Sequence, residues 1–244
     1  MEDSVIGGYT EKNRLVRQAI CAALDWDEQN EAFYNGINTV YDGVIPPGLE
    51  GYPAQGKSDK SYRGPDIERA RQLLAKAGYP NGEGLPTIDY YTGRQQNGQE
   101  QSEMLSKQLK RIGINVQVHL LDFSQLIQKV DEKSAQFFSF AWSSDYPDGE
   151  NNLALFYGPN EAPGANHFNY KNAEYDRLYE KVVAMPQSPE RVAIYEQMQA
   201  MLFEDCPYAG SMARTRFYVV TPRMTNFKPT ETFETWYKYI DLTD

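Results

Sequence analysis

The sequence predicts an α/β fold in which a mixed, mostly parallel sheet is flanked by helices. Strand-like and helix-like segments alternate between residues 86 and 142. The connections between successive strands run to roughly twelve residues or more, which suits helical crossovers between parallel strands. Hydrophobic residues make up 41% of the 244 residues, which is enough to bury a core.

The N-terminal quarter of the chain predicts two helices and a long loop. Apolar residues recur at helical spacing over residues 13–25, and a second, shorter helix is expected over residues 27–36. Gly and Pro residues then interrupt any regular element over residues 42–65. A loop of this length is usually functional or crosses the surface of a domain.

The middle of the chain carries the alternation itself. An amphipathic helix is expected over residues 67–77, with Asp66 as its N-cap and Gly78 at its C-terminal end. The next predicted elements are a strand over 86–92, a helix over 97–112, a strand over 114–121, a helix over 123–132 and an aromatic-rich strand over 136–142. In parallel sheets ligands bind beyond the carboxyl ends of the strands, and the segment after Trp142 is such an end.

The last third of the chain predicts two more helices and then extended structure. One helix is expected over residues 173–184, and Ser188 caps a second one that runs to about Glu204. A strand is expected over residues 215–221, and an extended segment over residues 231–242.

The charge balance is acidic, with 24 Lys and Arg against 34 Asp and Glu and a formal net charge of −10. Nucleic acids and anionic membranes both attract basic surfaces, so this balance argues against both as partners. No apolar run approaches the ~18 residues of a transmembrane helix. Residues 1–14 are polar and lack the apolar core of a signal peptide.

Three motifs of common enzyme classes are absent from the sequence. It contains no GxSxG, HExxH or GxGxxG. His119 and His167 are the two histidines, and they do not form a zinc-ligand spacing with the two cysteines. His119 is expected to be a surface or hydrogen-bonded histidine. Cys21 and Cys206 could form a disulfide or remain separate thiols, and the sequence leaves both open.

The segment DYPDGE places Asp145, Asp148 and Glu150 directly after the aromatic-rich strand. Such carboxylates suit a glycosidase pair or a calcium loop, but no second motif supports either. The plainer use is electrostatic, because Asp145 beside Trp142 and Tyr146 would hold a ligand ammonium between aromatic walls. The alternative is structural, with Asp145 capping the next turn and Trp142 in the core.

Seven segments follow one another in a recognisable order. They are NRLVRQAICAALDWDE at 13–28, VIPPG at 44–48, YRGPDIERARQLLAKAGYPNG at 62–82, KQLKRIGINVQV at 107–118, AWSSDYPDGENNL at 141–153, HFNYKNAEYDRL at 167–178 and the helix at 189–206. The series resembles the bacterial family 5 extracellular solute-binding proteins, the oligopeptide, dipeptide and nickel receptors of ABC importers. The resemblance covers roughly residues 12–220.

The resemblance implies a periplasmic-binding-protein-like lobe of type II, the second of two lobes that close over a ligand. Residues 1–220 would form this lobe, and residues 221–244 the segment that crosses back toward the first lobe. The chain would then be a fragment, without its signal sequence, of a protein on the periplasmic or extracellular face of the cell membrane. That protein would be a monomer without enzymatic activity or cofactor. It would bind peptides or other small solutes and deliver them to the transmembrane permease subunits.

The resemblance also assigns binding residues. Asp145 matches the aspartate that pairs with the ligand α-ammonium in peptide-binding members, Trp142 matches a pocket-lining tryptophan, and Tyr146 is adjacent. The predicted strand 136–142 lacks the basic residue that some oligopeptide receptors carry for the ligand carboxylate. His167 is the candidate contact for a nickel-type ligand, but it lies in an ordinary stretch of the family pattern, so no metal site is assigned.

Two other functions remain open at this point. One is a carboxylate-dependent hydrolase that uses Asp145 with Asp148 or Glu150. The other is a receptor lobe repurposed for signalling or for interaction with other proteins.

Overall fold

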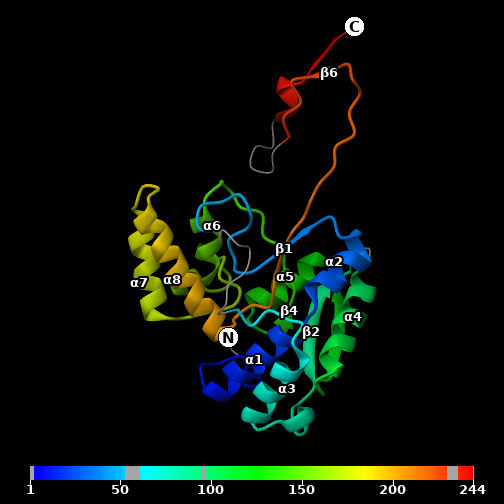
Figure 1. Cartoon of the computed structure of the whole chain (residues 1–244), viewed down its shortest axis with the longest axis vertical. Coiled ribbons are helices and arrows are strands. Elements are labelled where there is room, and N and C mark those ends of the chain that lie inside the picture. Colours follow the sequence, from blue (N-terminus) through cyan, green and yellow to red (C-terminus); the bar gives the residue numbers. More distant parts are fainter. Residues whose placement is uncertain (1–2, 53–60, 95–96, 230–235, 244) are drawn as a thin grey trace.

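The computed structural model describes residues 3–52, 61–94, 97–229 and 236–243. Its centre is a parallel sheet with the strand order β3-β2-β4, which confirms the predicted α/β class (Figure 1). The strands are β2 (Ile88–Gly93), β3 (Val116–Leu121) and β4 (Phe137–Phe138). Because all three run in the same direction, their carboxyl ends meet at one edge of the sheet.

Helices cover both faces of this sheet. Ile88 and Tyr90 of β2 are buried in a core shared with one group of helices, whereas Tyr91 lies under the ammonium group of Lys129 on the opposite face. The first group is α1 (Glu11–Ala23), α3 (Ile67–Lys76) and α4 (Gly98–Lys110), and the helix on the other face is α5 (Phe123–Asp131). The two faces of β2 follow from the two-residue period of a strand.

A second apolar core lies beside the first. It is built around α7 (Ala173–Val183), α8 (Pro189–Asp205) and the short helix α6 (Gly149–Leu153). The other elements of the body are α2 (Trp26–Tyr34), the antiparallel pair β1 (Thr39–Tyr41) and β5 (Ser211–Ala213), and the 3-10 helices η1 (Pro80–Gly82), η2 (Ala154–Phe156) and η3 (Gly158–Asn160). The sequence did not predict β1 or β5.

Local sequence sets the helix ends. The side chain of Asp66 accepts a hydrogen bond from the backbone N–H of Arg69 at 3.0 Å, and that of Ser188 accepts one from Arg191 at 3.2 Å. Both predicted N-caps are therefore confirmed. Gly78 adopts φ 86° directly after α3, a left-handed conformation that favours glycine and ends the helix.

Two predicted strands need correction. The strand expected over residues 136–142 is confined to β4, because the chain leaves the sheet after Ser139 makes a last backbone hydrogen bond to β2. The strand expected over residues 215–221 does not form, since these residues join no sheet of the described chain. The side chains of Phe217 and Val219 are 73% and 101% exposed, so this β-forming sequence lacks the packing that stabilises a strand.

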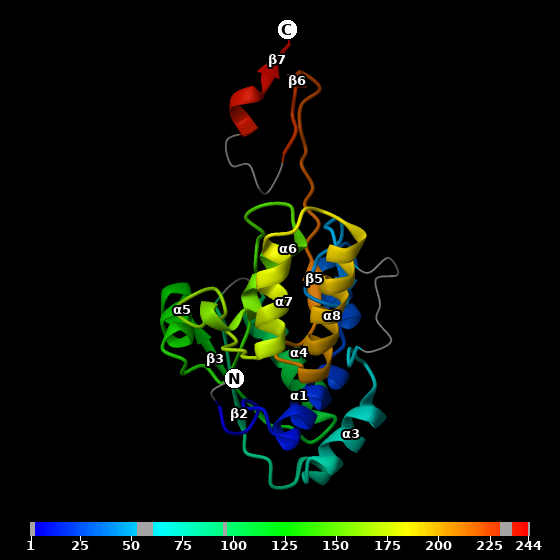
Figure 2. The same cartoon turned by 90° about the vertical axis from the view of Figure 1, so that its left-hand side faces the viewer.

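The end of the chain stands away from both cores (Figures 1 and 2). There β6 (Met224–Thr225) pairs antiparallel with β7 (Asp241–Leu242). The extended segment expected over residues 231–242 is wrong for η4 (Trp236–Tyr239), which is a 3-10 helix, and residues 230–235 lie outside the described residues.

The predicted loop over residues 42–65 forms no helix or strand in its described part, and residues 53–60 lie outside the described residues. Among the helices of the described ranges, none combines the length and the apolar character needed to cross a bilayer.

Candidate functional site

The candidate site lies where the chain leaves the sheet. After β4, residues 139–148 pass the edge at which the carboxyl ends of the parallel strands meet, and α6 follows. In Figure 1, α6 lies on the side of the sheet from which the C-terminal tail departs. Trp142, Asp145 and Tyr146 all belong to this segment, so the structure brings together the three residues that the sequence singled out.

Asn151 of α6 fixes the relative position of Trp142 and Asp145. The indole Nε1 of Trp142 donates to Asn151 Oδ1 at 2.9 Å, and the backbone N–H of Asp145 donates to the same oxygen at 3.2 Å. The Nδ2 group of Asn151 donates to Asp145 Oδ2 at 3.2 Å. Asn151 itself is buried, with 6% of its surface exposed. One rigid amide therefore holds an indole and a carboxylate side by side.

Trp142 and Asp145 both remain open to solvent. The Trp142 side chain is 42% exposed, so the alternative that places it in the core is wrong. Asp145 is exposed and forms no salt bridge with any described residue. The N-cap of α6 is Asp148, not Asp145. A carboxylate in this state is available to a cationic group from outside the chain.

Tyr146 presents its ring rather than its hydroxyl. The ring is 45% exposed, while the hydroxyl donates to Glu150, which also accepts a hydrogen bond from Tyr179. Partial burial and the hydrogen bond to Glu150 raise the pKa of Tyr146. Glu150 is buried and serves these two hydroxyls, so its carboxylate acts as an anchor for the site segment.

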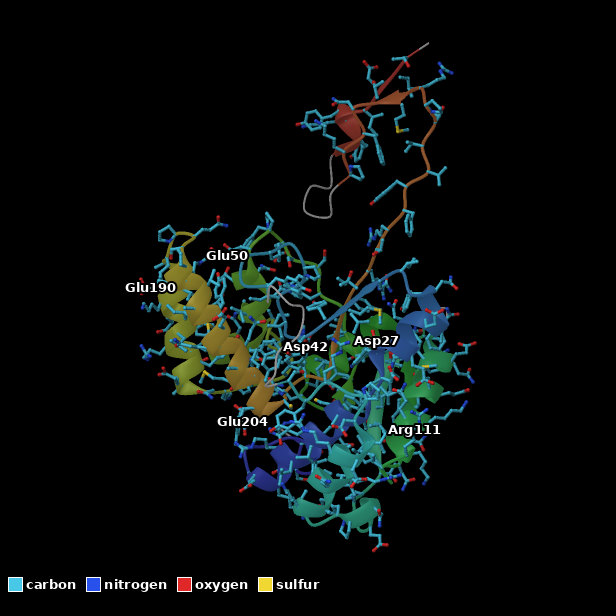
Figure 3. All side chains as sticks on the ribbon, in the orientation of Figure 1. Asp27, Asp42, Glu50, Arg111, Glu190 and Glu204 are labelled. Carbon is cyan, nitrogen blue, oxygen red and sulfur yellow. The ribbon has the colours of Figure 1, made fainter. Side chains whose placement is uncertain are left out.

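Asp148 is likewise committed to the structure. Its carboxylate accepts hydrogen bonds from Arg191 at 2.7 Å and from the hydroxyl of Tyr195 at 2.9 Å, and Arg191 also binds Glu50 at 2.7 Å. Burial alone would raise the pKa of Asp148, but the hydrogen bonds from Arg191, the backbone N–H of Glu150 and Tyr195 hold it below its usual value. Figure 3 shows Glu50 close to α6.

Sequence reasoning missed two residues of this edge. Arg94 directly follows the central strand β2, is exposed, and donates from Nη2 to the carbonyl of Leu120 at 3.2 Å. It forms no salt bridge within the described ranges. The residues after Trp142 were chosen because ligands bind beyond the carboxyl ends of parallel strands. The same rule applies to Arg94. Asn151 offered no such signal, because an Asn at a helix start resembles a solvated residue.

Aromatic side chains complete the edge. Phe123 begins α5 directly after β3 and is 68% exposed. Its ring centroid lies 6.5 Å from that of Phe140, which in turn lies 5.4 Å from that of Phe138. An exposed ring such as that of Phe123 excludes water once a second surface covers it, which strengthens polar contacts formed beside it.

The two histidines have structural partners. His119 is hydrogen bonded to Asp89 at 2.7 Å, as expected for a satisfied surface histidine. His167 lies 3.6 Å from a carboxylate oxygen of Asp131 and packs edge-on against Phe140, and burial lowers its pKa. In the described part of the chain, no group of three or more His, Cys, Asp and Glu side chains is placed to hold a metal ion.

The chain is similar in sequence to a family of known proteins. The sequence model described as "Bacterial extracellular solute-binding proteins, family 5 Middle" matches residues 9–164. The chain is 26% identical over 220 residues to Heme-binding protein A of Haemophilus influenzae, covering 88% of this chain and 39% of the relative. It is 29% identical over 223 residues to the Oligopeptide-binding protein AppA of Bacillus subtilis, covering 82% and 39%. The chain thus spans well under half the length of these curated relatives.

Solved structures share the fold. The periplasmic binding protein DppA of Helicobacter pylori, solved in complex with the peptide STSA, superposes with a TM-score of 0.80 at 22% identity, covering 98% of this chain and 46% of that one. A periplasmic oligopeptide-binding protein of Borrelia burgdorferi superposes with a TM-score of 0.78 at 24% identity, covering 98% and 47%. The expected type II periplasmic-binding-protein fold is confirmed.

Proposed function

Because the chain belongs to the bacterial extracellular solute-binding proteins of family 5, we propose that it is one lobe of the substrate receptor of an ABC importer. The proposed ligands are peptides or similar small solutes that carry a free ammonium group. The observation that carries this proposal is the state of Asp145, an exposed carboxylate that lacks a salt bridge within the described residues and is held beside the Trp142 indole by Asn151.

In the proposed complex, Asp145 accepts the ligand ammonium. Trp142 and Tyr146 form the walls of the subsite, with their rings exposed and their polar atoms bonded to Asn151 and Glu150. A charge-assisted hydrogen bond of this kind gains strength as water is excluded. Because Asn151 already orders the Asp145 carboxylate in the free protein, ordering that side chain adds less to the entropy cost of ligand binding.

Arg94 is the proposed partner of the ligand carboxylate. It follows β2, and Asp145 follows β4, which pairs directly with β2. Because these two strands are parallel neighbours, both residues follow carboxyl ends that meet at the same edge of the sheet. A guanidinium binds a carboxylate in a bidentate manner, and opposite charges at one edge match the two termini of a short peptide.

We further propose that residues 1–220 form this lobe and that residues 221–244 cross toward the other lobe of the receptor. The exposed Phe217 and Val219 support this division, because such side chains are usually covered by another surface. Closure of two lobes over the ligand would then create the form that the permease recognises, on the periplasmic or extracellular face of the membrane. The proposed receptor is a monomer.

The proposed function is ligand binding, with no bond made or broken. Glu150 and Asp148 are engaged by Tyr146, Tyr179, Arg191 and Tyr195, which leaves Asp145 without a second free carboxylate in this cluster. A hydrolase built on Asp145 with either neighbour is therefore not favoured, since two carboxylates would need to face one substrate.

A thermal-shift screen of the two-lobe receptor tests the proposal. Di- to pentapeptides, amino sugars and metal chelates would be compared, because a ligand that binds the native state raises the melting temperature. We expect peptides with a free N-terminus to stabilise the receptor. Stabilisation by chelates or neutral sugars alone would refute the proposed ligand class.

A further inference from the structure

One face of α1 meets the C-terminal end of α8. Arg14 lies 3.4 Å from the carboxylate of Glu204, Arg17 Nε donates to the carbonyl of Asp205 at 2.8 Å, and Gln18 donates to the carbonyl of Glu204 at 2.7 Å. Figure 3 shows Glu204 at the end of α8 nearest to α1. The α1 residues are spaced three and four apart, so they form one stripe on the helix.

The next residue of this stripe is Cys21, and the next residue of α8 is its C-cap, Cys206. Both are buried, with 7% and 6% of their surfaces exposed, and both are free thiols. The Cys21 thiol donates to the carbonyl of Tyr208 at 3.4 Å, the Cys206 thiol donates to the carbonyl of Phe203 at 3.1 Å, and both cysteines line one cavity. The contacts that dock α1 on the end of α8 thus also bring the two cysteines to the same cavity.

The surroundings of the thiols act on their reactivity in opposite directions. Arg17 is buried, its Nη2 has no hydrogen-bond partner among the described residues, and its positive charge acts on both cysteines. The neighbouring Cys21 and burial raise the pKa of Cys206, whereas Arg17 opposes the rise by stabilising the thiolate. A cavity of about 30 Å³ is lined by both cysteines.

We propose that Cys21 and Cys206 are a disulfide-forming pair that links α1 to the end of α8. The oxidant is a disulfide, such as oxidised glutathione. One cysteine thiolate attacks it, forms a mixed disulfide and releases one thiol; the second cysteine then displaces the other half. Two protons and two electrons leave the pair, one S–S bond forms, and the oxidant becomes two thiols. The supply of oxidant rests on the proposed location outside the cytoplasm, whereas ligand binding plays no part.

The bond would join the two cores. Cys21 belongs to α1, which packs on the parallel sheet, and Cys206 ends α8, which packs on α7. The loop closed by the bond contains most of the chain, and a long loop gives a large stabilisation when its cross-link restricts the unfolded state.

The test is oxidation of the folded, reduced chain with oxidised glutathione, followed by alkylation in denaturant and mass spectrometry. The chain has only these two cysteines, so the readout is unambiguous. We expect both thiols to disappear, the mass to fall by about 2 Da and a Cys21–Cys206 cross-linked peptide pair to appear. The melting temperature should rise by roughly 5–15 °C and return on reduction.

Cys21→Ala and Cys206→Ala are the matched controls and should show neither the mass loss nor the reversible rise in melting temperature. Retention of two alkylatable thiols, under conditions that oxidise the unfolded chain, would overturn the proposal. Oxidation only to glutathione adducts or to intermolecular dimers would also overturn it. Failure of the receptor to bind peptides would refute the proposed function and leave this result unaffected.

Discussion

Asn151 is predicted to be a positioning residue for the ligand subsite. Replacing it by Ala removes the acceptor of the Trp142 indole and the Asp145 backbone N–H, and also the donor to the Asp145 carboxylate. Trp142 and Asp145 are both exposed, so water can replace the hydrogen bonds that they lose and the chain should still fold. What is lost is the ordering of two side chains of the proposed ligand subsite.

The size of the effect follows from that ordering. Immobilising a flexible side chain on binding costs about 0.5–1.5 kcal/mol, so ordering both Trp142 and Asp145 costs about 1–3 kcal/mol. Affinity for a peptide ligand should therefore fall roughly 5–150-fold in Asn151→Ala. The loss of stability should be about 1–2 kcal/mol, since hydrogen bonds that water can replace contribute little each.

Calorimetry on the two-lobe receptor measures the affinity, and Asn152→Ala supplies the matched control. Asn152 is equally buried, but its Oδ1 accepts its hydrogen bond from Ser144, at 2.9 Å, and not from Trp142 or Asp145. The control should lower the melting temperature and leave the affinity within about threefold. The indole N–H resonance of Trp142 should shift in Asn151→Ala only. Equal affinity losses in both variants would refute the positioning role.

Three further predictions concern the same edge and its support. Arg94→Ala should weaken binding of peptides with a free C-terminus roughly 10–100-fold, and C-terminally amidated peptides should be insensitive to it in calorimetry. The pKa of Asp148 is lowered in the fold, so the stabilisation that its carboxylate gives is present above about pH 4 and is lost as pH falls through the folded pKa. Urea unfolding from pH 7 to pH 2 should show this loss of stability, and Asp148→Asn should abolish the part of the pH dependence that Asp148 causes. This chain by itself should bind peptides only weakly or not at all, because in the proposed receptor it supplies one side of the cleft; micromolar affinity in calorimetry would contradict that.

Local patterns predicted most elements because their causes are local. Helical periodicity and capping residues such as Asp66 and Ser188 act within a few residues, and both caps hold in the structure. The pairing of β1 with β5 joins three-residue strands that are far apart in the sequence, so no local pattern marks it. The strand expected over residues 215–221 failed for the same reason, since β-forming residues need a partner to pair with.

The candidate site divides in the same way. The sequence and the family resemblance predicted that the site lies after a parallel strand and includes Asp145 and Trp142. They did not predict the hydrogen bonds from Asn151 that hold these residues, because these bonds cross a turn that only the folded chain forms. Arg94 also lies beyond the carboxyl end of a parallel strand, but that strand is β2 and not the one before Trp142.

The central claim is that Asp145 binds the ligand ammonium. The most direct test titrates the two-lobe receptor and its Asp145→Asn variant with one peptide and its N-acetylated form, with Glu103→Gln as a remote exposed-carboxylate control. We predict that acetylation and Asp145→Asn each weaken binding roughly 100-fold, that the two losses are not additive, and that Glu103→Gln changes nothing. Additive losses, or unchanged binding to Asp145→Asn, would contradict the claim.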